Sequence, residues 1–473
     1  METNEVTPTT TAAAPLSRYL PATGGPIAGP IEPPLFSSET SPHHPHHRNP
    51  LGLAANSFHV IGTTGLNAAL GYAYWLVAAH WFTADAIGVA TAAIAAISLA
   101  SLFASGGLDT WLVQNLPKSD SKDWAAKVGS ALAFVGVVGC ITGLITALIS
   151  RPHGTGSAAM GLGITLGLVS IGAATWTMAN LIDGAFMADR RADAMLIRNA
   201  GFGVGKLIML IAVAAVGMSR SSVNLTIVWV AATLLSVVCS LTIQFRRLHR
   251  SVSFKRHEVA GSVHHMLGTT GWHFLTNMGG RLPMYVLPLI VINRASSTDN
   301  AHFYVAWMLG SLFFVVSNGA AGTLLASGAE PGADLSTLTR TSVIFIAKVL
   351  PTLAIGSIVF GRFALGLFGP GYSRAGYQMV LVLVAAAIPD GITSIATSLM
   401  RLRNQHRQAA ALNLSMAAMS CVLAYILVPH WGITGAGAGW AISQTAGSVA
   451  VAIVYGIRRS TRKRNTHEGS ATQ

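Results

Sequence analysis

Several ionisable side chains fall inside long apolar stretches of this sequence, among them Arg281, Asp390 and Lys206. An ionisable group at the centre of a bilayer costs about 2.5–3.5 kcal/mol on insertion scales, so each is first considered for a functional role. Arg281 lies about fifteen residues into its stretch, close to mid-depth at about 1.5 Å per helical residue. Its guanidinium can donate paired hydrogen bonds to a pyrophosphate, which makes it a candidate substrate anchor. The alternative is an internal ion pair that holds helices in register.

Asp390 directly follows Pro389 in another apolar stretch. A proline removes a backbone donor and can leave a kinked, polar position in a membrane helix. Asp390 is therefore a candidate site for coupling to a proton or another cation, or equally the structural counter-ion of Arg281 or Lys206. Lys206 lies about ten residues into its stretch, and its long side chain can reach the membrane surface from there. Such snorkelling is the alternative to a role in substrate binding.

Two groups of polar residues recur at intervals of three or four, which places each group on one face of a helix. The first group is Asn56, His59, Thr63 and Asn67, and the second is His273, Asn277 and Arg281. Because a sugar needs donors and acceptors along its path, we assign substrate binding to His59, Asn67, His273 and Asn277. The same faces suit hydrogen bonds between helices, which is the alternative for both histidines.

The composition indicates that membrane helices carry these residues. Hydrophobic residues make up 52% of the 473 residues and charged residues 10%, with a mean hydropathy of +0.54. A soluble domain usually carries about 25% charged residues, so lipid is the solvent for most of the chain. The net charge of +13 does not indicate a nucleic-acid partner, because Lys and Arg form short clusters between apolar runs.

About twelve stretches reach the roughly 20 apolar residues that a spanning helix needs. They are 56–81, 86–108, 125–149, 158–185, 196–218 and 224–245, then 265–292, 301–325, 341–360, 377–400, 409–428 and 433–455. This pattern predicts an all-α membrane protein with two six-helix lobes around a central cavity.

The charges of the loops alternate as this helix count requires. One side receives Lys118, Lys122, Lys127, Arg190, Arg191, Arg198, Arg246, Arg247, Arg250, Lys255, Arg256, Arg340, Arg401, Arg403, Arg407 and the basic C-terminal residues. The other side receives single residues, namely Arg151, Arg220, Arg294, Arg362 and Arg374. The positive-inside rule therefore places both termini in the cytoplasm of a multi-pass cell-membrane protein.

The domain boundaries follow from the same pattern. We expect a disordered cytoplasmic tail over 1–50, a first lobe over 51–245, a basic connector over 246–262, a second lobe over 263–457 and a basic tail over 458–473. The first tail is rich in Pro, Thr, Ser and His, and its run of His43, His44, His46 and His47 is more typical of a solvated low-complexity segment than of a metal site. Cys140, Cys239 and Cys421 fall in apolar segments without metal-ligand spacing, so we expect no cofactor.

An internal repeat supports the division into halves. At an offset of about 214 residues a few positions of the second half match positions of the first. The matched pairs are His59 with His273, Gly65 with Gly279, and Asp85 with Asp299. The offset also matches the first helix with the seventh, as two halves in parallel orientation require.

Three segments carry a resemblance to a known family: 104–117 (ASGGLDTWLVQNLP), 183–191 and 301–306 (AHFYVA). With the helix count and the basic connector, they resemble the Wzx-like polysaccharide flippases of the multidrug/oligosaccharidyl-lipid/polysaccharide exporter superfamily, over about residues 51–457. The resemblance implies an alternating-access carrier that moves a polyprenyl-linked oligosaccharide outward, with membrane lipids and polysaccharide assembly proteins as further partners. Relatives that flip the peptidoglycan precursor usually have more helices and more cavity cations, so this chain departs from them.

Other functions predict other residues. A drug or metabolite exporter of the same superfamily predicts acidic residues at mid-depth in the first three helices, which have none. A major-facilitator transporter predicts Asp-Arg after the second helix, whereas Thr110 follows Asp109.

A polytopic glycosyltransferase needs a catalytic carboxylate and a large outer loop, but the first outer loop is short and carries the lone Asp85, so we do not expect an enzyme. A membrane scaffold acting through its basic connector is the last alternative.

Overall fold

The computed structural model describes residues 50–150, 160–248, 250, 252–253, 271–330 and 332–471, and this part of the chain is helical without strands. The expected N-terminal tail with its histidines and most of the basic connector lie outside the described residues. So do the side chains of residues 50–61 and 458–471 and those of Thr64, Thr110, Gln114, Lys118 and His273.

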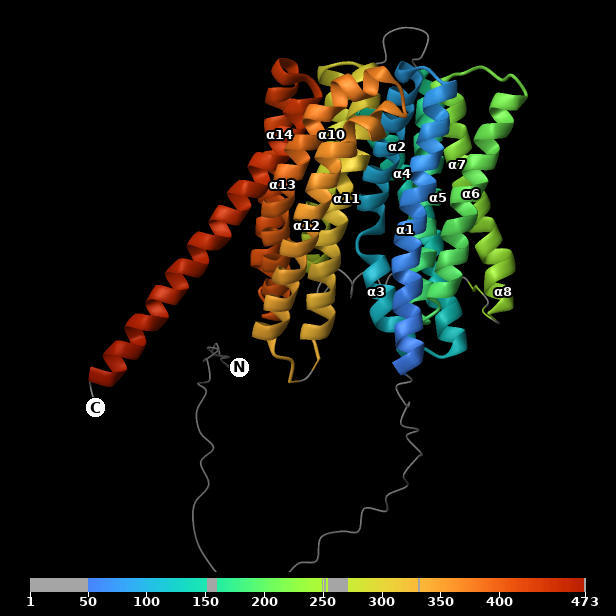
Figure 1. Cartoon of the computed structure of the whole chain (residues 1–473). Helices are drawn as coiled ribbons and strands as arrows, with labels where there is room; N and C mark the ends of the chain where they lie inside the picture. Colours follow the sequence, from blue (N-terminus) through green and yellow to red (C-terminus); the bar gives the residue numbers. More distant parts are fainter. Residues whose placement is uncertain are drawn as a thin grey trace, which may run out of the picture. The chain divides into compact units, whose positions relative to one another are not determined.

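The first lobe contains the helices that precede the connector (Figure 1). They are α1 (Pro50–Trp81), α2 (Ala84–Ser105), α3 (Leu108–Asn115), α4 (Ser121–Ser150), α5 (Leu162–Ala188), α6 (Ala192–Ala215), α7 (Ser222–Cys239) and, after one π-helical turn, α8 (Phe245–Arg247). The second lobe contains α10 (Gly271–Arg294), α11 (Ser297–Gly328), α12 (Leu335–Gly366), α13 (Pro370–Leu402) and α14 (His406–Ala471). We call the end of the bundle where α1 begins the proximal end, and the opposite end the distal end.

Ten helices within the described residues have the length and hydropathy of a membrane span. One of them, α14, contains two of the expected spans, because its backbone leaves the helical conformation at Gly432 (φ 55°, ψ −143°) and the chain turns back. The 32-residue helix α1 is a further crossing. The chain therefore traverses the bundle about twelve times, as the sequence predicts.

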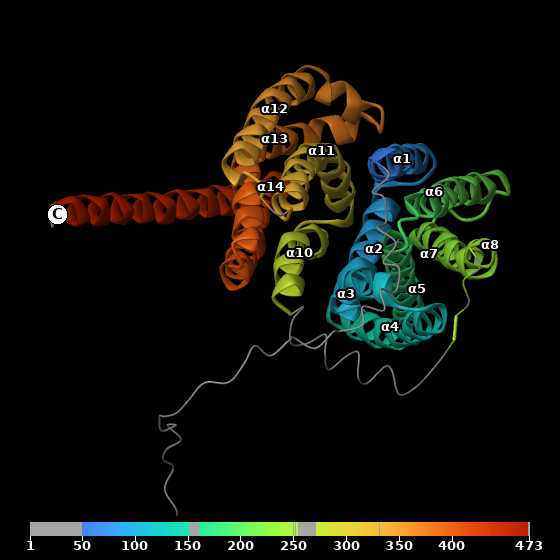
Figure 2. The same ribbon diagram turned by 90° about the horizontal axis from the view of Figure 1, so that it is seen from below.

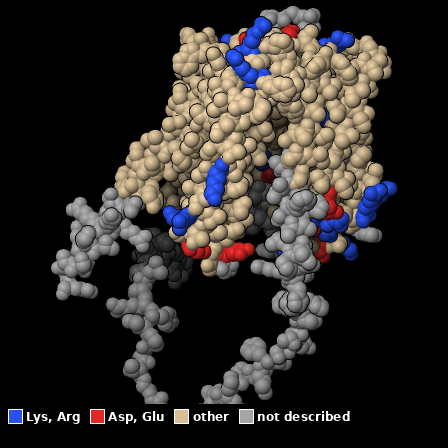
Figure 3. Space-filling model, in the orientation of Figure 1, with Lys and Arg blue, Asp and Glu red and all other residues tan. Residues whose placement is uncertain are grey.

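The surface between the two ends suits lipid. Large apolar side chains are exposed along the peripheral helix α12, for example Ile355 (64% exposed), Phe360 (64%) and Phe363 (67%). In Figure 3 most of the surface between the ends is free of charged side chains, while Lys and Arg gather mainly towards the ends. A soluble protein does not leave such a continuous apolar surface in water. The chain is a multi-pass membrane protein.

The short helix α3 differs from the expectation that one helix runs to Leu108. Gly106 and Gly107 have positive φ values of 50° and 87°, a conformation that breaks the helix and that glycine adopts at little cost. The segment 108–115 then starts a separate helix that packs on α5.

The two lobes meet mainly through α2, which packs against both α10 and α11 (Figures 1 and 2). Most of α2 is buried, including the stretch from Ala86 to Ala96, which is rich in alanine and other small residues. Small side chains allow helices to approach closely in a membrane. This makes α2 the central contact between the lobes.

Candidate functional site

A cavity of about 550 Å³ lies within the second lobe. Residues of α10, α11, α13 and α14 line it, from Thr276, Leu325 and Arg401 near the proximal ends of their helices to Met284 and Trp307 near mid-depth. Its volume is in the range of sites that hold one small ligand or one headgroup. Arg281, Asn277 and Asp390, three residues selected from the sequence, all contribute to its wall.

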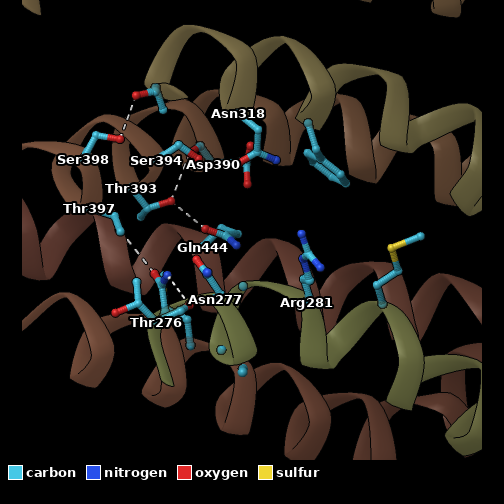
Figure 4. A pocket seen from close by; sticks show the side chains of 18 of the residues that line it. Thr276, Asn277, Arg281, Asn318, Asp390, Thr393, Ser394, Thr397, Ser398 and Gln444 are labelled. Atoms are coloured by element: carbon cyan, nitrogen blue, oxygen red, sulfur yellow. Dashed lines mark hydrogen bonds between the residues drawn. The ribbon is translucent and has the colours of Figure 1, made fainter. Parts of the chain in front are cut away.

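Arg281 lies on α10 and lines the cavity together with Asn277, one turn earlier (Figure 4). The Arg281 side chain is exposed, although it lies near the middle of the helix, and no hydrogen bond or ion pair holds it within the described part of the chain. A guanidinium at this depth is costly unless water or a ligand solvates it. The cavity supplies that space.

Close packing holds α10 in place beneath the cavity. A Cβ atom on Gly279 would lie 2.6 Å from the backbone of Asn413 in α14, so only glycine allows this approach. The Asn413 amide donates a hydrogen bond to the Thr276 carbonyl over 3.0 Å, and its oxygen accepts one from Thr397 of α13 over 3.3 Å. Three helices are thereby joined one turn from Arg281.

The wall opposite α10 is polar and includes Asp390 (Figure 4). Asp390 is 5% exposed, and its Oδ2 atom has no hydrogen-bond partner within the described residues. One turn later the Thr393 hydroxyl donates to the Gln444 side-chain oxygen over 2.8 Å, which ties α13 to α14. Asn318 of α11 is exposed on the same side of the cavity.

An aromatic group forms another part of the wall. Trp307 and Phe314 of α11 pack with Trp440 of α14, with ring centroids 5.5 Å apart for the two tryptophans and for Phe314 and Trp440. Aromatic faces next to hydroxyl and amide groups provide both apolar contact and directional hydrogen bonds.

The charged residues among those that line the cavity are two arginines, Arg281 and Arg401, and one aspartate, Asp390. No ion pair joins Arg281 or Lys206 to Asp390 within the described residues. In this conformation Asp390 is therefore the counter-ion of neither Arg281 nor Lys206. With all three groups ionised the cavity carries an excess of one positive charge, which favours an anionic ligand.

Lys206 and Asn67 lie elsewhere, in the first lobe. Lys206 on α6 is 8% exposed, with its Nζ atom 4.8 Å from the Phe202 ring centroid and 5.2 Å from that of Tyr74. Lys206 therefore does not reach the membrane surface, and the snorkelling alternative is wrong. Aromatic faces stabilise a cation by about 2 kcal/mol when it is desolvated, which offsets part of the cost of burial.

Asn67 on α1 belongs to a hydrogen-bonded network. Its amide donates to the Asn199 oxygen over 3.0 Å, and Asn199 in turn donates to Asp183 over 3.1 Å. Arg198, 4% exposed, pairs with both oxygens of Asp183 and donates to Ser236 over 3.2 Å. The sequence placed Arg198 among the surface charges, whereas it holds α5, α6 and α7 together.

The two histidines selected from the sequence fall outside this description. His59 and His273 lie on helical backbone, but their side chains are among the residues that the structure does not describe. Their assignment to substrate binding stays a prediction.

Several residues of the cavity escaped the sequence analysis, namely Asn318, Thr393, Arg401 and Gln444. Polar residues within the apolar stretches 301–325 and 433–455 were the available signal for Asn318 and Gln444. Arg401 was assigned to a loop because it follows the expected end of its span, but α13 continues to Leu402.

No protein-family model matches the sequence, and no curated protein matches it. Solved structures do match. The chain is similar to a multidrug resistance MATE family transporter of the MOP superfamily in its inward-facing conformation, with a TM-score of 0.63, 14% identity and coverage of 84% of this chain and 96% of that chain. The outward-facing conformation gives a TM-score of 0.61, 14% identity and coverage of 87% and 96%.

A third similar structure is a MOP superfamily transporter from Pyrococcus furiosus, for which a reversed polarity of the binding pocket suggests a different function. Its TM-score is 0.60 at 13% identity, with coverage of 86% of this chain and 96% of that chain. The structures that this chain resembles are transporters and not enzymes. The chain has the fold of the solved transporters of the MOP superfamily.

Proposed function

We propose that this protein is an alternating-access transporter that flips a polyprenyl-linked oligosaccharide, or a related polysaccharide precursor, across the cell membrane. The observation that carries the proposal is the exposed Arg281 at mid-depth in a cavity whose charged lining residues are two arginines and one aspartate. A guanidinium binds phosphate oxygens in pairs and is more weakly hydrated than an ammonium, so it suits a lipid pyrophosphate.

The rest of the cavity supports the saccharide part of the proposal. Asn277, Asn318, Thr393 and Gln444 offer neutral donors and acceptors, and Trp440 offers an aromatic face. A volume of about 550 Å³ holds the phosphate end and the first sugars rather than a long glycan. The remaining sugars and the lipid chain then extend outside the cavity.

The orientation belongs to the same proposal. Most basic loop residues lie at the proximal end, including Arg190, Arg247, Arg340 and Arg403, which makes this end cytoplasmic by the positive-inside rule. Asp390 is the candidate coupling residue, since a buried carboxylate that forms no ion pair within the described residues is a site for a proton or another cation.

A reconstituted flipping assay tests the proposal. In proteoliposomes that contain a fluorescent polyprenyl-pyrophosphate sugar, the unmutated protein should expose the sugar to an added lectin. Arg281→Ala should lower apparent affinity by about 10- to 100-fold, the range for losing one charge-assisted hydrogen bond or a pair of them. Arg374→Ala, an exposed arginine of α13 that is not among the cavity-lining residues, is the matched control. Equal apparent affinities for Arg281→Ala and Arg374→Ala would refute this role.

A second candidate is a drug or metabolite exporter of the same superfamily. The buried Asp390 carboxylate in the cavity favours it, because such a group can bind an organic cation. Efflux of a cationic dye that is abolished by Asp390→Asn and unaffected by Arg281→Ala would select this function over the flippase.

A further inference from the structure

The first turns of α2 and α11 are in direct contact at the distal end of the bundle. The Asp85 carboxylate of α2 accepts a hydrogen bond from the Ser297 hydroxyl of α11. A Cβ atom built on Gly88 would clash with the Ser297 carbonyl oxygen. No side chain fits at position 88 while the two helix starts keep this distance.

Asn300 adds a second connection between the same helices. Its amide donates to the Gly88 carbonyl over 2.8 Å and to the Thr91 hydroxyl over 3.1 Å. Asn300 is 0% exposed, so water cannot replace these hydrogen bonds while the contact holds. Breaking them leaves polar groups that must find water or another partner.

The two helix starts use their acidic residues differently, although they are matched in the internal repeat. In α11 the Ser296 cap accepts from the Asp299 amide and donates to the Asp299 carboxylate, so Asp299 serves its own helix. In α2 the Thr83 cap accepts from the Ala86 amide, which leaves Asp85 to bind across the lobes. Asp85 is therefore the member of the matched pair that binds across the lobes.

Contacts between α1 and the second lobe also lie towards the distal end. The Tyr72 hydroxyl donates to the Ala364 carbonyl of α12 over 3.1 Å, and the rings of Trp75 and Tyr304 are 5.1 Å apart. Closer to the proximal end, Asn67 of α1 and Asn318 and Gly322 of α11 are exposed. On this side the hydrogen bond and the ring contact between the lobes both lie towards the distal end.

The contact of α2 with α10 is not confined to the distal end. It extends to the proximal end, where the Phe274 side chain would lie 3.3 Å from a Cβ atom on Gly107. The lobes can thus remain joined along α2 and α10 while α2 separates from α11. In such a movement α2 and α10 would act as the hinge, and the contact of α2 with α11 would be released.

We propose that Asp85, Gly88, Ser297 and Asn300 form a latch that keeps the distal side closed, and that its release exposes the distal side during transport. The role of the latch in transport rests on the proposed function. Whether the latch exists concerns only the conformation of the protein. It can therefore be tested without any substrate.

The experiment measures distances between spin labels on the two lobes at the distal end, at Arg220 and Arg374, in a variant whose three native cysteines are replaced by alanine. The labelled protein is reconstituted as a full chain in lipid nanodiscs. We expect one short-distance population in the parent and a second, longer-distance population in Gly88→Ala and in Asn300→Ala. Gly201→Ala in α6, where an added Cβ meets nothing within 4 Å, is the matched control and should reproduce the parent.

A folded Gly88→Ala protein with the parent distance distribution would overturn the latch. Should Gly88→Ala fail to fold, Asn300→Ala decides in the same way, because it removes atoms and adds none. If the distal side opens in these variants while the unmutated protein flips no lipid, the proposed function is refuted and the latch stands. The two failures are therefore distinguishable.

Discussion

The side-chain amide of Asn413 in α14 binds the backbone carbonyl of Thr276 in α10 over 3.0 Å, five residues before Arg281. This bond fixes the turn of α10 that presents Asn277 to the cavity, with Arg281 on the turn that follows. We expect Asn413→Ala to lower apparent substrate affinity by about 2- to 13-fold, the effect of losing about 0.5–1.5 kcal/mol, with an unchanged maximal rate. The measurement is a concentration series in the flipping assay. Thr397→Val removes only the longer bond to Asn413 and should have a smaller effect; an equal loss in both variants would argue against this positioning role.

Asp390 provides a test of coupling. Asp390→Asn keeps the shape of the side chain and removes its ability to ionise. We expect substrate binding to persist while the ratio of transport rates with and without an ion gradient falls to about one. Proteoliposomes with imposed proton and sodium gradients give this ratio. Asp334→Asn, at the exposed start of α12, should keep the full dependence, and gradient dependence that survives in Asp390→Asn would remove Asp390 from the coupling step.

The Arg198 and Asp183 pair in the first lobe predicts a stability effect. Removing one member of a buried ion pair costs about 3–5 kcal/mol, because the other charge is left without its partner. Asp183→Leu should therefore lower the thermal midpoint in detergent markedly, since Arg198 is 4% exposed. The double variant Asp183→Leu with Arg198→Met removes both charges and should recover most of the loss. If the double variant has a thermal midpoint as low as that of Asp183→Leu, the pair stabilises the fold by more than the balance of its two charges.

Removing the charge of Lys206 is expected to keep or raise the thermal midpoint, in contrast to the Asp183 variant. Its ammonium contacts two aromatic rings and no carboxylate within the described residues. Methionine has a similar length and no charge to desolvate. We predict that Lys206→Met has a thermal midpoint equal to or above the parent value. Unchanged flipping by the same variant would separate Lys206 from substrate binding, and a loss of flipping in a stable protein would support the binding role predicted from the sequence.

The helices and their number were predictable because the physical signal is strong and local. An apolar stretch long enough to cross a bilayer must be helical, and alternating loop charges check the count. The depth of Arg281 in α10 followed from the same reasoning. Helix ends were less predictable: α3 exists because Gly106 and Gly107 adopt positive φ values, which depends on packing around them and not on hydropathy.

The cavity itself could not be predicted from helix positions along the chain. Which helices surround Arg281 depends on long-range contacts such as that between Gly279 and Asn413, about 130 residues apart. Reasoning from the sequence therefore grouped Lys206 and Asn67 with Arg281. In the structure Lys206 and Asn67 lie in the first lobe and Arg281 in the second. Polar residues within apolar stretches identified candidates; only the fold determines which of them face one another.

Confinement of the cavity to α10, α11, α13 and α14 has a consequence for energetics. If each lobe moves as a rigid unit, a solute held there keeps the same contacts whichever side of the membrane it faces. A ligand that binds two conformations equally well cannot shift the balance between them, however tightly it binds. Directional pumping would then have to draw its bias from groups whose surroundings differ between the two orientations, so Asp390 can couple transport to an ion only if its access to water changes as the lobes move.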